Sequence, residues 1–544
     1  MRSSVMVGVG IAALLGGMGA LGAGWPQGVR PAAVKGQKLP QFHGTINVDF
    51  GGTPGQGWHA IAKAYERIEP GVKVNIQWQN PSTYSTWLTA QFSAGHPTAD
   101  LVTNNTVAQL QAEGKFVNFQ PWLFHKDPYT HNLWLDNFNW NLIGYNPYTG
   151  YPGNGKLYDL NYQVIQVIWM YNKALWHKAG IYKTPTTFKQ LITDFKKLKK
   201  SGTIPFAIGG NYNSLWGDKG GWLMRIYPDQ YVRSSVRDAV SRPGDYNYVA
   251  SINKKWHYNP KNPNNDNSTQ VIVNPVRQWR LIQQAKRPSY NVASPKWMAV
   301  DRNLRTIFSY AEPGFVGVGD TQSDSLFLSQ KAATEVTGTW TISAFPKDLK
   351  NSLFTGKKGT AFKSFPYGFF NMPSMQGPYV EAPARTISLP IGFQGFVNKN
   401  PKQTALDMNF MMWLTSPAGQ RVAQEAALKS PNGAVTPVAI KGVSIPGKLG
   451  KEFASVKYIG DSEGKPTTAA SIARGLGDYQ PSVVAWVALA QKYLSGHMST
   501  KAYARASEAN IKKYFVPALE NVALMTPADL KTPQKKPVPP VKHG

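Results

Sequence analysis

The chain has 544 residues, too many for one hydrophobic core, and 42% of them are apolar, so two lobes or domains are expected. It contains no cysteine, which excludes disulfides, thiolate metal sites and cysteine nucleophiles and leaves none for a lipid anchor. The formal charge of +29 reflects 59 Lys and Arg against 30 Asp and Glu. Because the lysines are scattered, we interpret this charge as a depletion of acidic residues, with a polyanion-binding surface as the alternative.

The first 24 residues predict export from the cytoplasm. One basic residue, Arg2, precedes an apolar run from Val5 to Ala23 that is rich in small side chains. This pattern is typical of a signal peptide, and the run is also nearly long enough to remain as a membrane anchor. We expect residues 25–43 to be a polar linker. The body would then lie on the extracellular face of the membrane or in the periplasm, and only the N-terminal segment would contact the membrane.

The next segments alternate between predicted strands and helices. Strands are expected over 45–50, 72–78 and 99–102, where apolar residues alternate or run together. Helices are expected over 58–68 and 85–92. This alternation is typical of α/β lobes with a largely parallel sheet.

The stretch from 162 to 210 carries the most informative pattern. The β-branched run 164–170 predicts a buried strand, whose Trp169 we assign to the core. A short helix follows and stops at Gly180, and the motif TPTT then opens a helix with apolar residues at helical spacing. A further strand is expected over 204–208.

This order of a strand, the motif YNK, a short helix ending in AG, a helix opened by TP and a KxxG turn resembles the extracellular solute-binding proteins of ABC importers. The resemblance is to the carbohydrate-type family that includes maltose-binding protein. Six further segments in family order extend it over roughly 44–515. They are EPGVKV, SAGHPTADLV, AQLQAEGKFVNF, SQKAATEVTGTWTISAF, IGFQGFVNKNPKQTALDMNFMMWLTSPAGQ and QKYLSGHMSTKAYARA. In the fourth segment, Ser329 and Gln330 replace the glycine that opens the family's G-K-A-A-M motif.

The resemblance implies an α/β fold of the periplasmic-binding-protein type II class. Two lobes would be joined by a hinge of two or three crossings, with the ligand cleft between them. The N-lobe would combine residues 44–163 with 388–450, and the C-lobe would combine 164–387 with 451–520.

Two polar segments are expected to lie outside this framework. The turn-rich stretch Asn259 to Thr269 predicts a surface loop. Residues 521–544 are rich in Lys and Pro, which predicts a disordered tail.

The resemblance also implies a function. A small solute, expected to be an oligosaccharide, would be captured by hinge closure and delivered to the membrane permease of an ABC importer. The protein would be a monomer without cofactor, catalytic residues, metal ligands or nucleic-acid partner, and ATP would be hydrolysed by a separate subunit.

The motifs that would favour catalysis or nucleotide binding are missing. HExxH, G-x-S-x-G and metal-spaced histidines do not occur. The glycine-rich stretch 51–57 ends in Trp58 and His59 instead of Lys and Ser or Thr, so we expect a loop facing the cleft or a plain turn. Two alternatives remain open: a cationic polyanion-binding surface protein, and a secreted carbohydrate-active enzyme with a carboxylate pair such as Asp320 and Asp324.

The chain is rich in side chains that bind sugars, with 17 Trp and 25 Tyr. Aromatic rings stack on the apolar faces of sugars, and amides and carboxylates pair with their hydroxyls. Trp340 is the first candidate, because the tryptophan of the family's GxW segment commonly stacks on the ligand. The other candidates lie where the family places cleft residues. They are Asn104, Asn105, Trp216, Asn211, Tyr212, Tyr162, Gln163, Phe393, Gln394, Gln56, Trp58 and Tyr84.

Overall fold

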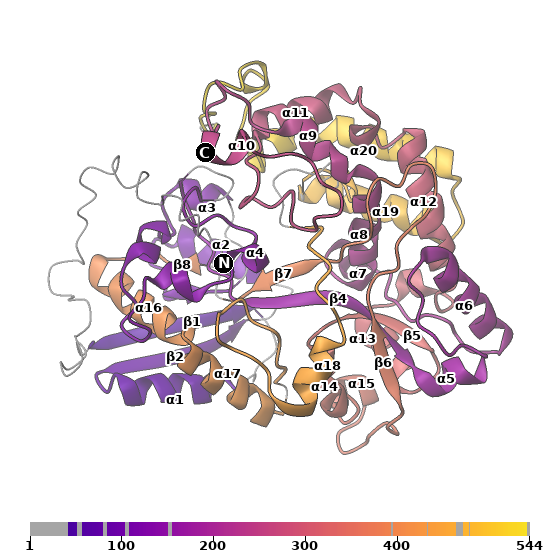
Figure 1. Ribbon diagram of the computed structural model, residues 1–544, viewed down its shortest axis with the longest axis horizontal. Helices are drawn as coiled ribbons and strands as arrows, with labels where there is room; N and C mark the ends of the chain where they lie inside the picture. The colour runs from indigo at the N-terminus through magenta and orange to yellow at the C-terminus, as the bar shows by residue number, and fades with distance from the viewer. Residues whose placement is uncertain are drawn as a thin grey trace, which may run out of the picture.

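The computed structural model describes residues 42–51, 57–79, 84–103, 108–150, 155–392, 395–431, 433–463, 472–477 and 479–540. Two sheets, each surrounded by helices, form two lobes that a long central strand connects (Figure 1). We call the lobe built on the sheet β2-β1-β3-β8 the N-lobe, and the lobe built on β4, β5 and β6 the C-lobe.

The N-lobe sheet is mostly parallel, as the alternation of elements predicts. Strand β1 pairs in parallel with β2 and β3, and β8 closes the sheet in the antiparallel sense. The strands are β1 (Gly44–Gly51), β2 (Val72–Gln79), β3 (Leu101–Val102) and β8 (Gly395–Phe396). The helices of this lobe are α1 (Trp58–Ile68), α2 (Tyr84–Ser93), α3 (Ala108–Ala112), η1 (Gln120–Phe124), η2 (Trp134–Asn137), α4 (Trp140–Ile143), α16 (Pro401–Leu414) and α17 (Pro417–Lys429).

The C-lobe sheet differs from the expectation of parallel pairing. Strand β4 (Gln163–Asn172) pairs antiparallel with β5 (Thr334–Gly338), β6 (Tyr367–Phe370) and β7 (Ser388–Ile391). The expected strand 204–208 forms only isolated parallel bridges, such as Ala207 to Glu335. A continuous apolar run indicates that a strand is buried on both faces. It does not indicate whether the adjacent strands are parallel or antiparallel, because that depends on the long connections between the strands.

Helices surround this second sheet and enclose a large apolar core. The core includes Trp169, which is fully buried as predicted. The elements that follow β4 are α5 (Lys173–Lys178), α6 (Phe188–Lys200), α7 (Tyr212–Trp216), α8 (Lys219–Val232), η3 (Arg233–Ser235), α9 (Val236–Ala239), α10 (Ala250–Asn253), α11 (Pro275–Gln284), η4 (Pro288–Tyr290) and α12 (Pro295–Phe308). After them come η5 (Phe315–Gly317), α13 (Asp320–Leu328), α14 (Thr341–Asp348), α15 (Ser352–Thr355), α18 (Gly447–Ala454), α19 (Gln480–Leu494), α20 (Thr500–Asn521) and η7 (Asp529–Lys531).

The chain passes between the lobes three times. Strand β4 makes the first crossing, since its Val164 packs in the N-lobe core and its Val167 in the C-lobe core (Figure 1). Strand β7 runs back beside it and leads into β8. The third crossing follows Ile440, the last residue of the N-lobe core, and leads to α18, whose Phe453 packs in a small cluster under β4.

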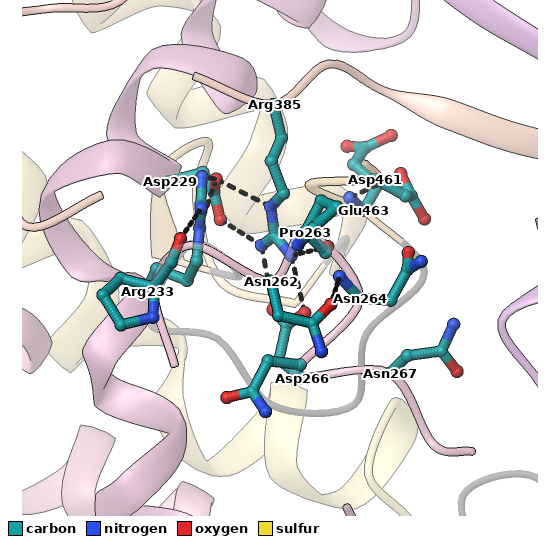
Figure 2. Close-up of polar contacts among 12 residues, drawn as sticks. Asp229, Arg233, Asn262, Pro263, Asn264, Asp266, Asn267, Arg385, Asp461 and Glu463 are labelled. Carbon is teal, nitrogen blue, oxygen red and sulfur yellow. Dashed lines mark hydrogen bonds and ion pairs between the residues drawn. The ribbon is translucent and has the colours of Figure 1, made fainter. Parts of the chain in front are cut away.

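A buried network of charged side chains lies just before β7 (Figure 2). The Arg385 guanidinium donates to both oxygens of Asp229, at 3.1 and 2.5 Å, and to both oxygens of Asp266, at 2.6 and 2.8 Å. Arg233 donates to Asp229 at 2.6 Å and to the Pro383 carbonyl at 2.6 Å. All four charged side chains are at most 2% exposed, and two arginines balance two aspartates.

This network corrects part of the prediction that residues 259–269 form a surface loop, because residues 265–268 are buried while residues 259 and 261 are exposed. Asp266 anchors the loop to Arg385 (Figure 2), and the next two residues, Asn267 and Ser268, are buried. The tip of the loop then reaches the N-lobe, where Ser268 donates to the Gly144 carbonyl at 2.7 Å and Asn267 to the Asn141 carbonyl at 3.1 Å. The end of this polar, turn-rich segment is therefore buried, because Asp266 pairs with Arg385 and the neighbouring amide and hydroxyl groups form hydrogen bonds.

The expectation of a disordered C-terminal tail is also wrong for most of its length. Leu530 is buried, and η7 packs against α11. The Pro533 carbonyl accepts hydrogen bonds from the Asn274 side chain at 2.9 Å and from the Tyr246 backbone at 3.2 Å. Within the described ranges, none of the helices is both long enough and apolar enough to cross a membrane.

Candidate functional site

A cavity of about 580 Å³ lies beside the start of β4, where the two lobes meet. The C-lobe supplies most of its wall, and the segment after α17 supplies the rest. The lining residues are Gln163, Ile165, Lys219, Asp324, Leu328, Glu335, Thr337, Trp340, Thr341, Ala344, Lys347, Asp348, Asn351, Leu353, Phe354, Pro431, Gly433, Ala434 and Thr436.

Trp340 is the indole side chain of this wall, and the local sequence dictates its position. It precedes the first residue of α14 and lies two residues after the end of β5. A Cβ atom placed on Gly338 would lie 1.8 Å from the Trp340 ring, so the ring rests on the backbone of Gly338. On another side it meets Trp222 edge to face, with ring centroids 5.9 Å apart. The spacing G-x-W is therefore needed because only glycine leaves room for the folded-back indole.

Charged side chains from three elements meet in the same wall. The ammonium group of Lys219, at the start of α8, lies between the carboxylates of Asp324 on α13 and Glu335 on β5. It forms an ion pair with Asp324 and lies 3.3 Å from Glu335. The backbone N–H of Lys219 points to Asp320 at 3.4 Å. Burial by itself would lower the pKa of Lys219, but Asp324 and Glu335 raise it, so this lysine stays charged.

The cavity wall has three carboxylates but only two lysines, and one of these lysines is bonded to carbonyl oxygens. Lys347 of α14 donates to the carbonyl oxygens of Ala427, Leu428, Ser430 and Gly433 at 2.7–3.1 Å, where it caps the C-terminus of α17. The side-chain carboxylate of its neighbour Asp348 has no hydrogen bond or ion pair with any residue that the structure describes. Burial and the nearby charge of Asp324 raise the pKa of Asp348 to about 7.

Two further acids behave in the same way. Burial raises the pKa of Asp320 to about 6, and burial raises that of Glu335 well above its usual range despite the attraction of Lys219. Acids with raised pKa values close to a cavity are typical of binding and catalytic sites.

The hinge side of the cavity adds uncharged polar groups. Gln163, the first residue of β4, lines the cavity, and its contact with a ligand stays a prediction. Thr436 is only 7% exposed, and among the described residues its hydroxyl oxygen has no hydrogen-bond partner. A buried hydroxyl without a partner costs free energy, so this one marks a place where a ligand atom would fit.

Of the residues predicted from the sequence, the structure brings Trp340 and Gln163 to the cavity. Asn211, Tyr212 and Trp216 lie on α7, which directly precedes α8. Asn211 caps this helix, and the Tyr212 hydroxyl donates to Gln480 at 2.9 Å. Their contact with a ligand stays a prediction.

The remaining predicted residues lie elsewhere or cannot be placed. Trp58 is buried against Phe50, with ring centroids 4.5 Å apart, and Tyr162 is buried in the N-lobe core. Tyr84 is buried beside Trp87 at the start of α2. The residues Gln56, Asn104, Asn105, Phe393 and Gln394 fall outside the described residues.

Sequence reasoning missed the charged part of the wall. Lys219, Glu335, Lys347 and Asp348 were not proposed, and Asp324 was named only as part of a catalytic pair with Asp320. Glu335 offered one usable clue, because it is an acid inside the otherwise uncharged run 332–346. Across the described ranges, no group of three or more His, Cys, Asp and Glu has a geometry that would hold a metal ion.

Comparison with solved structures supports this picture of the fold. A family 1 extracellular solute-binding protein from Bifidobacterium longum subsp. infantis matches with a TM-score of 0.52 and 15% identity, over 87% of this chain and all of the other. The GacH receptor of Streptomyces glaucescens, studied unliganded and with acarbose, gives a TM-score of 0.54, 13% identity and coverage of 87% and 99%. The protein RafE in complex with raffinose matches with a TM-score of 0.53 and 16% identity, over 86% of this chain and 99% of the other.

The sequence comparison extends from fold to family. No characterised protein sequence matches this chain closely. The profile of the family described as bacterial extracellular solute-binding protein matches residues 51–421, which is more than half of the chain. The chain therefore belongs to the bacterial extracellular solute-binding protein family.

Proposed function

We propose that the protein captures an extracellular oligosaccharide in the cavity beside Trp340 and presents it to the membrane permease of an ABC importer. The observation that carries this proposal is the composition of the cavity wall. An indole ring, apolar side chains and a few hydrogen-bonding groups surround a space within the usual size range of small-molecule sites. RafE and GacH, which share the fold, were studied with raffinose and acarbose.

The lobes that would close on this solute correspond to residues 44–163 with 388–450 and residues 164–387 with 451–520. The change of core between Val164 and Val167 supports the first of these boundaries. Within this scheme the protein is exported, acts as a monomer and reaches the membrane through its N-terminal segment and the permease.

Closure would be held by contacts between the lobes as well as by the solute. Lys347 of the C-lobe caps α17 of the N-lobe, and Ser343 accepts from the Val435 backbone at 2.8 Å. A solute that contacts both sides of the cavity has a higher affinity for the closed state and shifts the population toward it. The permease would then recognise the closed surface.

Thermal unfolding of the full chain with a panel of oligosaccharides tests the proposal. A ligand at a hundred times its dissociation constant adds about 2.7 kcal/mol to the free energy of unfolding. We expect this stabilisation with one sugar class and its loss in Trp340→Ala. The control variant Tyr182→Ala removes an exposed aromatic ring that does not line the cavity, and it should keep the stabilisation by the sugar. An unchanged response in Trp340→Ala would contradict the placement of the site.

The same samples test the enzyme alternative. Asp324 and Glu335 form a carboxylate pair at the cavity, but Lys219 lies between them and pairs with both. We therefore expect the bound oligosaccharide to be recovered intact after long incubation. Chromatographic detection of shorter sugars, lost in Glu335→Gln, would identify a hydrolase instead.

A further inference from the structure

The cavity wall has a charge opposite to that of the chain as a whole. Only 30 of the 544 residues are Asp or Glu, and the formal charge is +29. Yet Asp324, Glu335 and Asp348 all line this cavity, and Asp320 lies directly behind Lys219. A general depletion of acids would not place them together, so their position requires a local reason.

The cations near the cavity are already in use. The Lys347 ammonium faces four carbonyl oxygens at the end of α17, which leaves none of its three N–H donors for the cavity. The Lys219 ammonium is shared between Asp324 and Glu335. The carboxylate of Asp348 therefore remains on the wall without an ion pair to any described residue, although Lys219 and Lys347 lie near enough to act on its charge.

A second observation indicates that a ligand completes this wall. The hydroxyl oxygen of Thr436, buried on the N-lobe side of the same cavity, has no partner among the described residues. One molecule lying in the cavity would satisfy Thr436 with a hydroxyl or amide group and Asp348 with a positive group. Its remaining surface would lie against Trp340 and the apolar side chains of Leu353 and Phe354.

We propose that the solute carries a protonated amine that pairs with Asp348, which makes the ligand class an amino-bearing oligosaccharide. This inference rests on the proposed function and narrows it. A neutral sugar would leave the charge of Asp348 uncompensated in a partly desolvated wall, whereas an ammonium group would neutralise it. The ring of the sugar would stack on Trp340, where a nearby cation is also favourable.

The surroundings of Asp348 define its proton balance. Facing it or packed near it are Asp324 on α13, Lys219 on α8, Glu335 on β5 and Lys347 on α14. Helix α18, which packs on α14, carries Lys448, Lys451 and Glu452, and Lys448 lies 3.9 Å from Glu452. The cation of the solute would favour the ionised form of Asp348, so binding below the pKa of about 7 should release a proton from this carboxyl.

Matched oligosaccharides provide the test. The full chain would be titrated by calorimetry at pH 7.0 with chitosan oligomers, which carry free amines, and with chitin oligomers of equal length, which are acetylated and neutral. We expect the amine form to bind at least about tenfold more tightly, a difference of about 1.4 kcal/mol. Titration at pH 6 in two buffers of different ionisation enthalpy should show proton release with the amine form only.

Two variants assign the effect to one side chain. Asp348→Asn should abolish both the preference for the amine form and the proton release. Asp136→Asn, which removes the same charge from an exposed position on η2, should leave both unchanged.

The possible failures are distinguishable. Equal binding of amine and neutral oligomers, or a preference that survives in Asp348→Asn, would overturn this inference and leave the proposed function intact. If neither series binds at any length, and no other oligosaccharide stabilises the chain, the oligosaccharide function itself fails and the inference fails with it.

Discussion

Two clusters of charged side chains occupy the C-lobe and differ in how well their charges are balanced. Around Arg385, two arginines meet two aspartates, and the oxygens of both acids accept hydrogen bonds (Figure 2). Around the cavity, Lys219 faces two carboxylates while Asp348 stands without a partner among the described residues. The first cluster has no further need for a ligand, and the second does.

The pairing of buried charges distinguishes the structural cluster around Arg385 from the cluster at the cavity. Removing charges from water is costly, and this cost is recovered only when each charge has a partner of opposite sign and good geometry. The Arg385 cluster meets that condition and fixes the loop 259–269 against β7. The cavity cluster falls short, and its acids respond with raised pKa values.

The largest expected effect comes from breaking the balanced cluster. In Arg385→Met, Asp266 would remain buried without its arginine partner and Asp229 would keep only Arg233, which should lower the free energy of unfolding by about 3–5 kcal/mol. Denaturant unfolding measures this change. The control Arg287→Met removes an exposed arginine paired with Asp238 at 3.4 Å and should change stability by about 1 kcal/mol or less. Similar effects of both substitutions would contradict the structural role of Arg385.

A smaller effect is expected from the cation of the cavity cluster. Lys219→Met leaves Asp324 and Glu335 without an ammonium group, which should cost about 2–3 kcal/mol at pH 8. Because the pKa of Glu335 is already raised by burial, protonation at lower pH relieves the loss. Unfolding measured at pH 8 and pH 5 should therefore show the cost shrinking at pH 5. A cost independent of pH would indicate lost packing instead of lost charge.

Removing an unpaired charge should stabilise the protein without ligand. The pKa of Asp348 is raised in the folded state, so between pH 4 and 7 the folded protein binds more protons at this carboxyl than the unfolded chain, and stability falls as pH rises. Asp348→Asn removes this pH-dependent loss of stability. The free energy of unfolding should rise by about 1–2 kcal/mol at pH 8 and stay unchanged at pH 4. Thermal unfolding across this range measures it, and equal curves for both proteins would contradict the burial of the charge.

The smallest effect is expected from the hydrogen bond that joins the loop 259–269 to the N-lobe. Ser268→Ala removes the hydrogen bond to Gly144 while the loop stays anchored through Asp266, so stability should fall by about 1 kcal/mol or less. If this contact helps to set the angle between the lobes, small-angle scattering of the variant without ligand should show a larger radius of gyration. An unchanged radius would restrict the contact to a local role.

Part of the site was predictable because it depends on local sequence. The spacing of Gly338 and Trp340 places the indole on the backbone of Gly338, and this geometry depends on only three consecutive residues. Gln163 was predictable because it opens the strand that begins the hinge. The ion pairs of Lys219 were not, because their partners lie more than a hundred residues away on two other elements.

The sequence by itself determined the two-lobe class, the buried strand β4 with Trp169 and the family of the protein, since periodic apolar patterns and motif order are local properties. Only the tertiary structure decided that the C-lobe sheet is antiparallel, that residues 265–268 are buried, and that η7 packs against α11. The reason is the same in each case. Polar segments are buried when distant partners satisfy their charges and hydrogen bonds, and the position of those partners depends on the path of the whole chain.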